Sequence, residues 1–331
     1  MIRAAIIGAG KIAQGFDDPH GEAVLTHAKA YQKHGGFELV AFCDTDLERA
    51  RIAAARWKVP HAVDSIRKLA ALNPEVISIC TPDETHQDML AACLDLHPRL
   101  VFCEKPLALD SCKARDLVER YERENIGLLV NYSRRWSDPA REGNKLIQDG
   151  ACGKILSIRA RYYGGWFHNG SHLVDLIGLF FKPSVAGGGL LRKESLGNGD
   201  FRITGSVVLR RDSHAFPFHF ECLNEGRASH LELELLFEEG AFWMGERNGT
   251  VWRTSGISEN AVYPGYYELS EGQMEKTDPS DAMRRAAANI HGFLSHGEPL
   301  LSNGATALAT LGMCREICSL PETVKNSIWQ N

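Results

Sequence analysis

The first part of the chain alternates short apolar runs with segments of helical spacing. Apolar runs that indicate buried strands lie at residues 3–7, 37–43, 76–80, 100–103 and 127–130, with a brief one at 62–63. Helical spacing marks the intervening segments at 24–34, 46–56, 65–72, 85–96 and 110–124. Strands and helices in such regular alternation predict an α/β domain with a doubly wound parallel sheet over residues 1–130.

From about residue 131 onward the pattern changes to longer strands. A helix at 139–148 precedes a strand at 154–163, and period-two alternation then marks 203–209, 216–220 and 231–235. Gly187–Gly189 is typical of a flexible loop, and the last segments, 279–296 and 305–319, have amphipathic helical spacing. These features predict a second domain over 131–331, of α+β class with half-buried antiparallel strands. One face of its sheet would meet helices, and the other would meet water or a second subunit.

Composition and charge narrow the class of protein. The 331 residues carry a net charge of −5, with 44% hydrophobic and 24% charged residues, as in ordinary globular proteins. The chain therefore lacks the excess of positive charge that is typical of proteins that bind nucleic acid or an anionic membrane. No apolar run approaches the roughly 20 residues that span a bilayer, and Gly8 and Gly10 interrupt the apolar start, so we expect no signal peptide.

The nine cysteines are scattered and contain no CxxC pair. Their odd number and the absence of an export signal favour a reducing cytoplasm. Cys314 and Cys318 could share a helix face, but core packing is the favoured interpretation, and we expect no metal site.

A glycine-rich turn follows the first predicted strand at once. Gly8, Gly10 and Ala13 form the pattern GxGxxA between a strand and a helix. The first glycine permits a tight turn, the second lets backbone approach a pyrophosphate, and the small third residue lets helix pack on strand. The N–H groups of Lys11 and Ile12 would face the phosphates. The pattern favours dinucleotide binding over a glycine-rich turn without a ligand.

Asp44 ends the second predicted strand. An acidic residue there can bond the ribose hydroxyls of NAD and repel the 2′-phosphate of NADP, so NAD is favoured. Thr45 and Arg49 argue for caution, and NADP stays an alternative. The separation from the glycines exceeds the usual ~20 residues because a turn-rich loop at 16–22 interrupts the first helix. Asp44 could also cap the following helix.

Two further strands end in polar residues at the edge where open α/β sheets bind ligands. Thr81 and Pro82 follow the strand at 76–80, and we expect them near the nicotinamide or its ribose. His86, early in the next helix, could reach inward, although a histidine at the surface is equally expected there.

The strand at 100–103 delivers Glu104 and Lys105 to the same edge. Pro106 then ends the strand because it has no N–H to donate. Lys105 is a candidate acid or base group, and we assign Glu104 to the cofactor-binding residues. The alternative is a solvated lysine beside a surface glutamate.

A second constellation lies at His168, His172 and Asp175. If a helix starts near residues 169–171, His172 and Asp175 are separated by three positions and share one face. A carboxylate beside an imidazole fixes its tautomer and raises its basicity. His168 could join the same pocket, whereas the alternative is a capped helix with two partly exposed histidines. No third and fourth ligand appears at the spacing of a zinc site.

Three of these motifs occur in the same order in a known family, namely Gly8-x-Gly10-x-x-Ala13, Glu104-Lys105-Pro106 and His172-x-x-Asp175. In this the chain resembles the glucose–fructose oxidoreductase/inositol dehydrogenase/rhizopine-catabolism (Gfo/Idh/MocA) family of NAD(P)-dependent oxidoreductases. The likeness covers nearly the whole chain. It implies a nucleotide-binding Rossmann fold followed by an α+β domain with a large open, mainly antiparallel sheet. Such sheets commonly form the oligomer interface, so the resemblance implies a homodimer or homotetramer.

The resemblance makes Lys105 the catalytic or substrate-orienting lysine and His172 the histidine of the second motif, with Asp175 behind it. In inositol dehydrogenase-like members an aspartate lies four positions before that histidine, where this chain has His168. Either His168 takes over that role, or the substrate differs from a simple cyclitol. Histidine titrates near neutral pH, whereas a lysine base needs its pKa strongly lowered. We therefore expect His172 to be the base and Lys105 to orient the hydroxyl.

The expected reaction is hydride transfer between a nicotinamide and a ring CH–OH or C=O of a sugar, sugar derivative or cyclitol. Candidates for contacts with the ring, each as readily explained by core packing, are Arg135, Trp136, Tyr163 and Trp166, with His168 and Lys105 beside them. The alternatives are a regulator that binds the cofactor without chemistry and a glycosidase that oxidises its substrate transiently.

Overall fold

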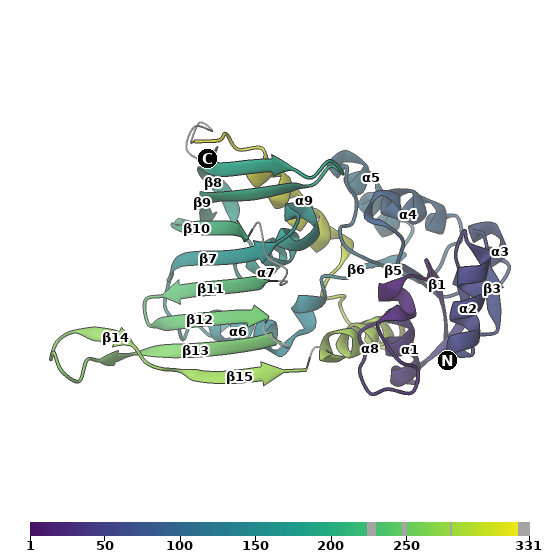
Figure 1. Cartoon of the computed structure of the whole chain (residues 1–331), viewed down its shortest axis with the longest axis horizontal. Coiled ribbons are helices and arrows are strands. Elements are labelled where there is room, and N and C mark those ends of the chain that lie inside the picture. The colour runs from purple at the N-terminus through teal and green to yellow at the C-terminus, as the bar shows by residue number, and fades with distance from the viewer. Residues whose placement is uncertain (224–229, 247–249, 279, 324–331) are drawn as a thin grey trace. The chain divides into compact units, whose positions relative to one another are not determined.

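The chain forms two compact units in the computed structural model, which describes residues 1–223, 230–246, 250–278 and 280–323 (Figure 1). The first unit comprises residues 1–136 with 279–308, and the second comprises 137–278 with the chain from 309 onward. The functional division into 1–130 for the cofactor and 131–331 for the substrate stays a prediction.

The first unit contains a six-stranded parallel sheet in the order β3-β2-β1-β4-β5-β6. Its strands are β1 (Ile2–Ile7), β2 (Phe37–Cys43), β3 (His61–Val63), β4 (Val76–Ile79), β5 (Leu100–Cys103) and β6 (Gly127–Val130). Its helices are α1 (His27–His34), α2 (Leu47–Trp57), α3 (Ile66–Ala70), α4 (His86–Leu94), α5 (Ser111–Arg123) and α8 (Ser280–His296). Every residue of β4, β5 and β6 is buried, as expected for parallel strands covered on both faces. The predicted doubly wound parallel sheet is confirmed.

The helix after the glycine turn is shorter than predicted. Residues 11–15 form a single π-helical turn, and α1 starts at His27 rather than at residue 24. The buried Asp17 carboxylate accepts hydrogen bonds from the backbone N–H and the hydroxyl of Thr26, the N-cap of α1. These bonds tie the preceding loop to the helix start and so fix where α1 begins.

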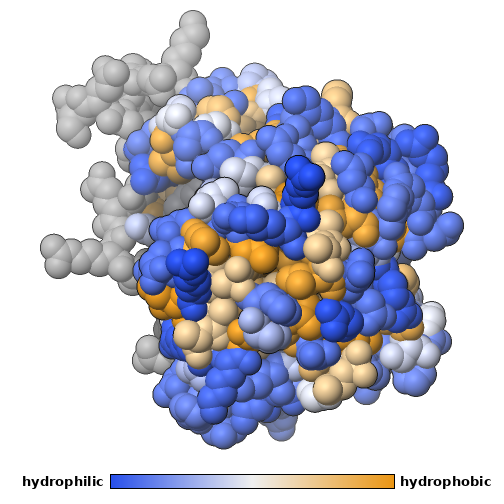
Figure 2. Space-filling model, turned by 90° about the vertical axis from the view of Figure 1, so that its right-hand side faces the viewer, coloured by the Kyte–Doolittle hydropathy of each residue, from blue (hydrophilic) through white to orange (hydrophobic). Residues whose placement is uncertain are grey.

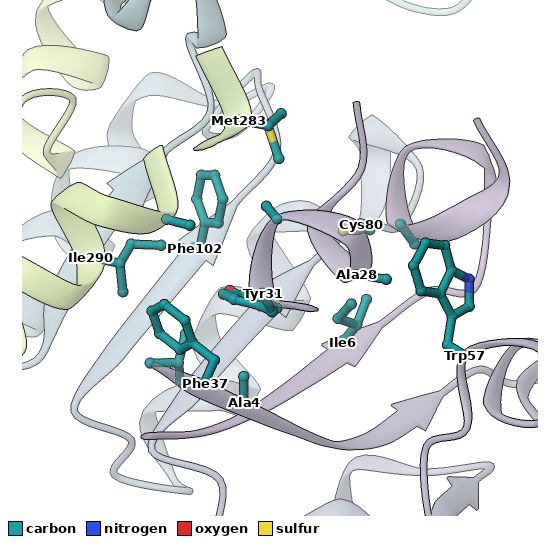
Figure 3. Close-up of a cluster of buried hydrophobic side chains, with 14 of the residues drawn as sticks. Ala4, Ile6, Ala28, Tyr31, Phe37, Trp57, Cys80, Phe102, Met283 and Ile290 are labelled. Carbon is teal, nitrogen blue, oxygen red and sulfur yellow. The ribbon is translucent and has the colours of Figure 1, made fainter. Parts of the chain in front are cut away.

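The core of the first unit combines side chains from distant parts of the chain (Figure 3). Tyr31 of α1 packs on Phe37 of β2, with ring centroids 4.8 Å apart. Met283 and Ile290 of α8 are buried in the same cluster. Helix α8 is therefore part of the hydrophobic core of the first unit.

The second unit contains a nine-stranded sheet in the order β14-β13-β12-β11-β7-β10-β9-β8, with β15 paired to β13. Its strands are β7 (Ile155–Tyr163), β8 (Ser184–Ser195), β9 (Phe201–Arg211), β10 (His214–Leu223), β11 (Leu231–Phe237), β12 (Gly240–Glu246), β13 (Thr250–Glu259), β14 (Tyr267–Leu269) and β15 (Gln273–Thr277). Its helices are α6 (Asp138–Gln148), α7 (Ser171–Phe181) and the part of α9 (Gly304–Cys318) from residue 309 onward. Strands β7 and β10 run parallel, and the other pairs in the described part of the sheet are antiparallel. The mainly antiparallel sheet is thus confirmed.

The two faces of this sheet differ in chemistry. On one face Phe181 of α7 contacts Phe216, with ring centroids 5.6 Å apart. On the other face Arg161 lies 3.3 Å from the Glu221 carboxylate and 3.7 Å from that of Glu232. Period-two alternation produces this division, because successive side chains of a strand point to opposite faces.

The prediction of a flexible loop at Gly187–Gly189 is wrong, because these residues lie inside β8. The register shifts between Val185 and Gly187, which is a bulge. Gly188 has φ +138°, and a Cβ there would stand 2.4 Å from the carbonyl oxygen of Ser206 on β9. Glycine is needed here because the neighbouring backbone approaches too closely for a side chain.

The surface in Figure 2 is mostly hydrophilic, with hydrophobic residues gathered near its middle. Among the described residues, no helix is both long and apolar enough to cross a membrane. All nine cysteines are free thiols.

Candidate functional site

The carboxyl ends of the parallel strands bring several of the predicted residues to one edge of the first unit. The strand order reverses between β1 and β4, so ligands are expected in the crevice outside these two strands. Gly8 follows β1, Asp44 follows β2, Thr81 lies just beyond β4, and Glu104 follows β5. This juxtaposition follows from the fold alone, since parallel strands end on the same side.

The glycine turn has the backbone that a dinucleotide site requires. Gly8 has φ +88°, and a Cβ there would stand 2.6 Å from the carbonyl oxygen of Cys80. Gly10 faces open space, since a Cβ there would meet nothing nearer than a guanidinium nitrogen of Arg49 at 3.9 Å. Ala13 is fully buried where the turn packs on the sheet. The turn therefore fits a pyrophosphate, which must approach the backbone over Gly10.

Asp44 is buried and tied to that turn. One carboxylate oxygen accepts the N–H of Ala9 at 2.8 Å, and the other accepts that of Asp46 at 3.0 Å. The guanidinium of Arg49 lies 3.7 Å from the first of these oxygens. The N-cap of α2 is Asp46, not Asp44, so the capping role considered for Asp44 is wrong. Its bond to Ala9 fixes the strand end against the glycine turn.

His86 points inward and connects two loops of the same edge. It is fully buried, with Nδ1 2.7 Å from the carbonyl oxygen of Pro106 and Nε2 2.9 Å from that of Thr81. The hydroxyl of Thr85 donates to that of Thr81 at 2.7 Å. Thr81 is half-buried and Pro82 exposed, so this loop offers surface to a ligand while His86 holds it in place.

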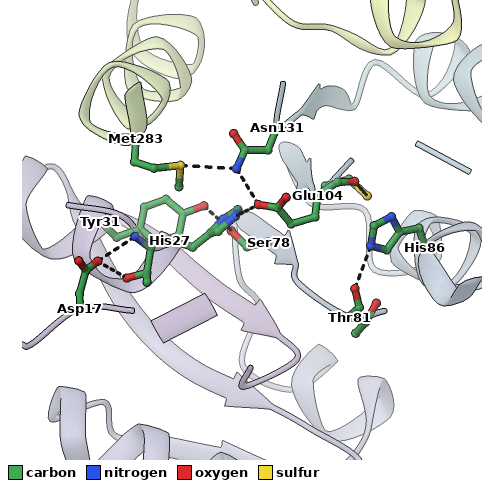
Figure 4. A network of polar contacts seen from close by, with 11 residues as sticks. Asp17, His27, Tyr31, Ser78, Thr81, His86, Glu104, Asn131 and Met283 are labelled. Carbon is green, nitrogen blue, oxygen red and sulfur yellow. Dashed lines mark hydrogen bonds and ion pairs between the residues drawn. The ribbon is translucent and has the colours of Figure 1, made fainter. Parts of the chain in front are cut away.

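Glu104 belongs to a buried polar network (Figure 4). Its Oε1 lies 2.9 Å from Nε2 of His27 and accepts Nδ2 of Asn131 at 2.6 Å. Burial raises the pKa of the Glu104 carboxyl, but the His27 and Asn131 bonds and the charge of Lys105 outweigh it and hold that pKa below its usual value. Lys105 itself is half-buried.

Sequence reasoning missed four members of this network, namely His27, Tyr31, Ser78 and Asn131. The hydroxyl of Ser78 lies 3.0 Å from Nδ1 of His27 and 2.7 Å from the hydroxyl of Tyr31. Ser78 lies within an otherwise apolar strand, and such a buried hydroxyl needs a partner. That was the one available signal, because His27 and Asn131 sit at element ends where polar residues are ordinary.

In the second unit, the segment that carries His168 is held by a single carboxylate. Residues 166–170 form a π-helical turn that leads into α7. The buried Asp200 accepts the N–H of Phe167 at 2.8 Å, of His168 at 3.0 Å and of Phe201 at 2.7 Å. The His168 side chain is exposed.

His172 and Asp175 lie in the first turns of α7, as predicted, and both are buried. The hydroxyl of Thr310 donates to a carboxylate oxygen of Asp175 at 3.0 Å. Lys105 belongs to the first unit and His172 to the second. Their convergence on one nicotinamide therefore stays a prediction.

The four residues suggested as ring contacts differ in exposure. Tyr163 is half-buried, whereas Arg135 and Trp136 are buried, with an Arg135 guanidinium nitrogen donating to the carbonyl of Leu301 at 3.0 Å. Trp166 is fully buried, and its Nε1 donates to a backbone carbonyl at 2.9 Å. Trp136 and Trp166 therefore pack in the core, which was one of the two interpretations that the sequence allowed for them. Among the described residues, no cluster of three or more His, Cys, Asp or Glu could hold a metal ion.

Comparison with known proteins gives matches over this same region. Residues 2–132 match the model of a family described as "Oxidoreductase family, NAD-binding Rossmann fold". The chain is 27% identical over 201 residues to D-glucoside 3-dehydrogenase of Escherichia coli (strain K12), which covers 57% of this chain and 50% of that protein. It is 29% identical over 158 residues to inositol 2-dehydrogenase of Rhizobium meliloti (strain 1021), which covers 47% and 44% respectively. The chain thus matches about half the length of these curated relatives.

A likeness over almost the entire fold is found among solved structures. The WlbA dehydrogenase from Bordetella pertussis, solved in complex with NADH and UDP-GlcNAcA, superposes with a TM-score of 0.71 at 21% identity. That superposition covers 96% of this chain and 95% of the other, so the two proteins share the fold. The nucleotide-binding part of the chain, residues 2–132, therefore matches the Gfo/Idh/MocA family of oxidoreductases.

Proposed function

We propose that the protein is an NAD(P)-dependent dehydrogenase or reductase. It would transfer a hydride between the nicotinamide and a ring CH–OH or C=O of a sugar, sugar derivative or cyclitol. The observation that carries this proposal is the single sheet edge where the glycine turn, Asp44, the Thr81–Pro82 loop and Glu104–Lys105 meet. Two matched relatives bear the names of a glucoside and an inositol dehydrogenase, both of which act on ring hydroxyls.

The cofactor would lie along this edge. Gly8, Gly10 and the N–H groups of Lys11 and Ile12 would hold the pyrophosphate, and Asp44 the adenosine ribose. The Thr81–Pro82 loop, with His86 behind it, would line the nicotinamide end. When bound, the nicotinamide supplies a two-electron hydride acceptor or donor.

The substrate proton would pass to His172. As the carbinol C–H leaves as hydride, the hydroxyl proton moves to an imidazole nitrogen of His172 and the C=O bond forms. Asp175, whose carboxylate accepts the hydroxyl of Thr310, would orient that imidazole. The ammonium of Lys105 hydrogen-bonds the same hydroxyl oxygen and stabilises its developing negative charge. His168 would contact a neighbouring hydroxyl or replace the relay aspartate of inositol dehydrogenase-like relatives.

The test is a substrate screen followed at the NADH absorbance. The panel contains myo-inositol, methyl β-D-glucoside, free aldoses and UDP-sugars, each with NAD and with NADP. We expect Lys105→Ala and His172→Ala each to lower kcat/KM at least about 100-fold on the best substrate, with NAD binding retained. The matched controls are Lys113→Ala and His61→Ala, which change exposed side chains of the same types.

Two outcomes would contradict this proposal. Retained cofactor with glycoside cleavage and no net NADH would indicate a glycosidase that uses transient oxidation. NAD binding without turnover of any panel member, and without an effect of either variant, would indicate a regulator.

We further propose a cytoplasmic homo-oligomer. All nine cysteines are free, which suits a reducing compartment, and subcellular fractionation tests this location. The charged sheet face around Arg161 and Glu221 would form the contact between subunits as a homodimer or homotetramer. Sedimentation analysis of the native protein and of Arg161→Glu should give an oligomer and a smaller species, and a monomeric native protein would refute this.

A further inference from the structure

The side chain of Gln14 makes three hydrogen bonds that join the glycine turn to the end of α2. Its Oε1 accepts Nη1 of Arg56 and Nε1 of Trp57, each at 3.0 Å. Its Nε2 donates to the carbonyl oxygen of Ala9 at 3.3 Å. Two donors meet one end of the amide and an acceptor meets the other, so only this orientation satisfies all three partners. Trp57 belongs to the hydrophobic core of the first unit (Figure 3), so the amide is anchored to a packed part of the fold.

The carbonyl that receives this bond belongs to the peptide between Ala9 and Gly10. The peptide is trans, so its C=O and its N–H point in opposite directions. With the carbonyl held by Gln14, the N–H of Gly10 points away from that side chain. Among the described residues this N–H donates to no acceptor, and the space beside Gly10 is open. The turn therefore keeps one backbone donor available to a phosphate oxygen of the expected pyrophosphate.

The backbone alone does not hold this peptide in place. A half-turn of the peptide plane changes φ of Gly10 from −78° to about +100°, and glycine adopts positive φ about as readily as negative φ. The same rotation directs the Ala9 carbonyl, in place of the N–H, towards the phosphate, and a carbonyl oxygen repels an anion. The N–H of Ala9 lies on the preceding peptide, where the Asp44 carboxylate accepts it at 2.8 Å, so Asp44 does not prevent the rotation.

We propose that Gln14 is a positioning residue for the cofactor, because its amide holds the Ala9–Gly10 peptide with the N–H available to the pyrophosphate. Without this amide the rotated peptide becomes populated. The apparent affinity for the dinucleotide then falls with the fraction of molecules that keep the binding orientation. The inference rests on the proposed function for the presence of a pyrophosphate, but the orientation of the peptide does not depend on a ligand.

The test compares Gln14→Met with the native protein. Methionine has about the length of glutamine but no N–H to donate. NADH is titrated by the change in its fluorescence, and ADP-ribose and adenosine are titrated as its competitors. The Kd values of NADH and ADP-ribose, which both contain a pyrophosphate, should rise about tenfold, as they would if about one molecule in ten kept the binding orientation. The Kd of adenosine, which contains no phosphate, should change less than about twofold.

Two other variants complete the comparison. Gln14→Glu keeps acceptors for Arg56 and Trp57 and pairs its charge with Arg56, but it has no donor for the Ala9 carbonyl. It should show the same selective loss, and it replaces Gln14→Met if that variant does not fold. Trp57→Phe is the matched control, because it removes one bond to the Gln14 amide and leaves the bond to Ala9. It should lower the melting temperature and leave the Kd of NADH within about twofold of the native value.

A crystal structure of Gln14→Met without cofactor gives a readout that needs no ligand. We expect the Ala9–Gly10 peptide in the rotated orientation, or in both, with φ of Gly10 near about +100° in the rotated one. A peptide that keeps only its native orientation in this variant overturns the inference. A Kd of NADH within about twofold of the native value also overturns it, as does an equal weakening of NADH and adenosine, which indicates a general loss of the binding surface.

Failure of the proposed function gives a different result. A native protein that binds neither NADH nor ADP-ribose refutes the dinucleotide site, and the role of Gln14 with it. Native binding that Gln14→Met retains in full refutes the role of Gln14 alone.

Discussion

Removal of the buried Asp200 carboxylate should strongly lower the stability of the second unit. This carboxylate accepts three backbone N–H groups, those of Phe167, His168 and Phe201, at 2.7–3.0 Å. Asp200→Ala would leave all three N–H groups without this acceptor. The perturbation lies outside the proposed proton relay, yet it acts on the turn that carries His168.

The expected loss follows from those bonds. A hydrogen bond to a charged group contributes about 1.5–3 kcal/mol, so three independent bonds would contribute about 4.5–9 kcal/mol. They share one acceptor, and water can enter the space that alanine leaves, so we expect a loss of about 3–5 kcal/mol in the free energy of unfolding. In Asp200→Asn the remaining oxygen can still accept from Phe167 and Phe201, while the amide meets the N–H of His168, so about 1–2 kcal/mol should be lost.

Calorimetry measures the effect on the melting temperature. A loss of about 4 kcal/mol should lower it by about 8–16 °C for a domain of this size class. Asp149→Ala, which removes an exposed carboxylate from the same unit, is the matched control and should change little. If Asp200→Ala melts within a few degrees of the native protein, the three bonds do not hold the turn. The same variants should lower kcat/KM in the order Ala, then Asn, if the turn positions His168.

Three further outcomes are expected. Gly8→Ala forces a Cβ to 2.6 Å from the carbonyl of Cys80 at φ +88°, so it should cost about 2 kcal/mol or more and weaken NAD binding at least tenfold, measured by melts with and without NAD. Asp44→Ala leaves Arg49 without the nearby anion, so the ratio of kcat/KM for NAD over NADP should fall about tenfold or more, and an unchanged ratio would contradict the assignment. The pKa of Glu104 is lower in the folded protein than in the unfolded chain. Its contribution to the stability of the fold is therefore fully present above the ordinary pKa of glutamate and is lost as the pH falls through the lowered pKa. Between about pH 6 and about pH 3, the melting temperature of Glu104→Gln should therefore fall less steeply than that of the native protein.

Local patterns predicted the strands well where each was a closed apolar run. The strands at 100–103 and 127–130 have the predicted bounds, because polar or turn residues flank apolar runs that are buried on both faces. The start of α1 could not be predicted in this way. It depends on Asp17, which is distant from any helical pattern and acts through tertiary hydrogen bonds. The prediction of a flexible loop at Gly187–Gly189 failed for a related reason. A run of glycines by itself indicates backbone flexibility, whereas here the neighbouring strand leaves no space for a side chain.

For the candidate site, the motifs gave the residues at strand ends but not what lies beneath them. Gly8, Asp44 and Lys105 could be named because a strand end has a fixed meaning in a parallel sheet. His27 could not, because its role depends on which side chains two other strands place against α1. Which face of a helix meets which strand is decided by packing, and a single sequence carries no record of it.

The packing of α8 against the first unit has a consequence for how the protein is made. Synthesis proceeds from the N-terminus at about 5–20 residues per second, and an N-terminal domain normally folds as soon as it emerges. Here Met283 and Ile290 complete the core around Tyr31 and Phe37, so a nascent chain ending at residue 136 still exposes part of that apolar surface to the ribosome and to chaperones. The core of the nucleotide-binding unit can therefore be completed only after α8 (Ser280–His296) has also been synthesised.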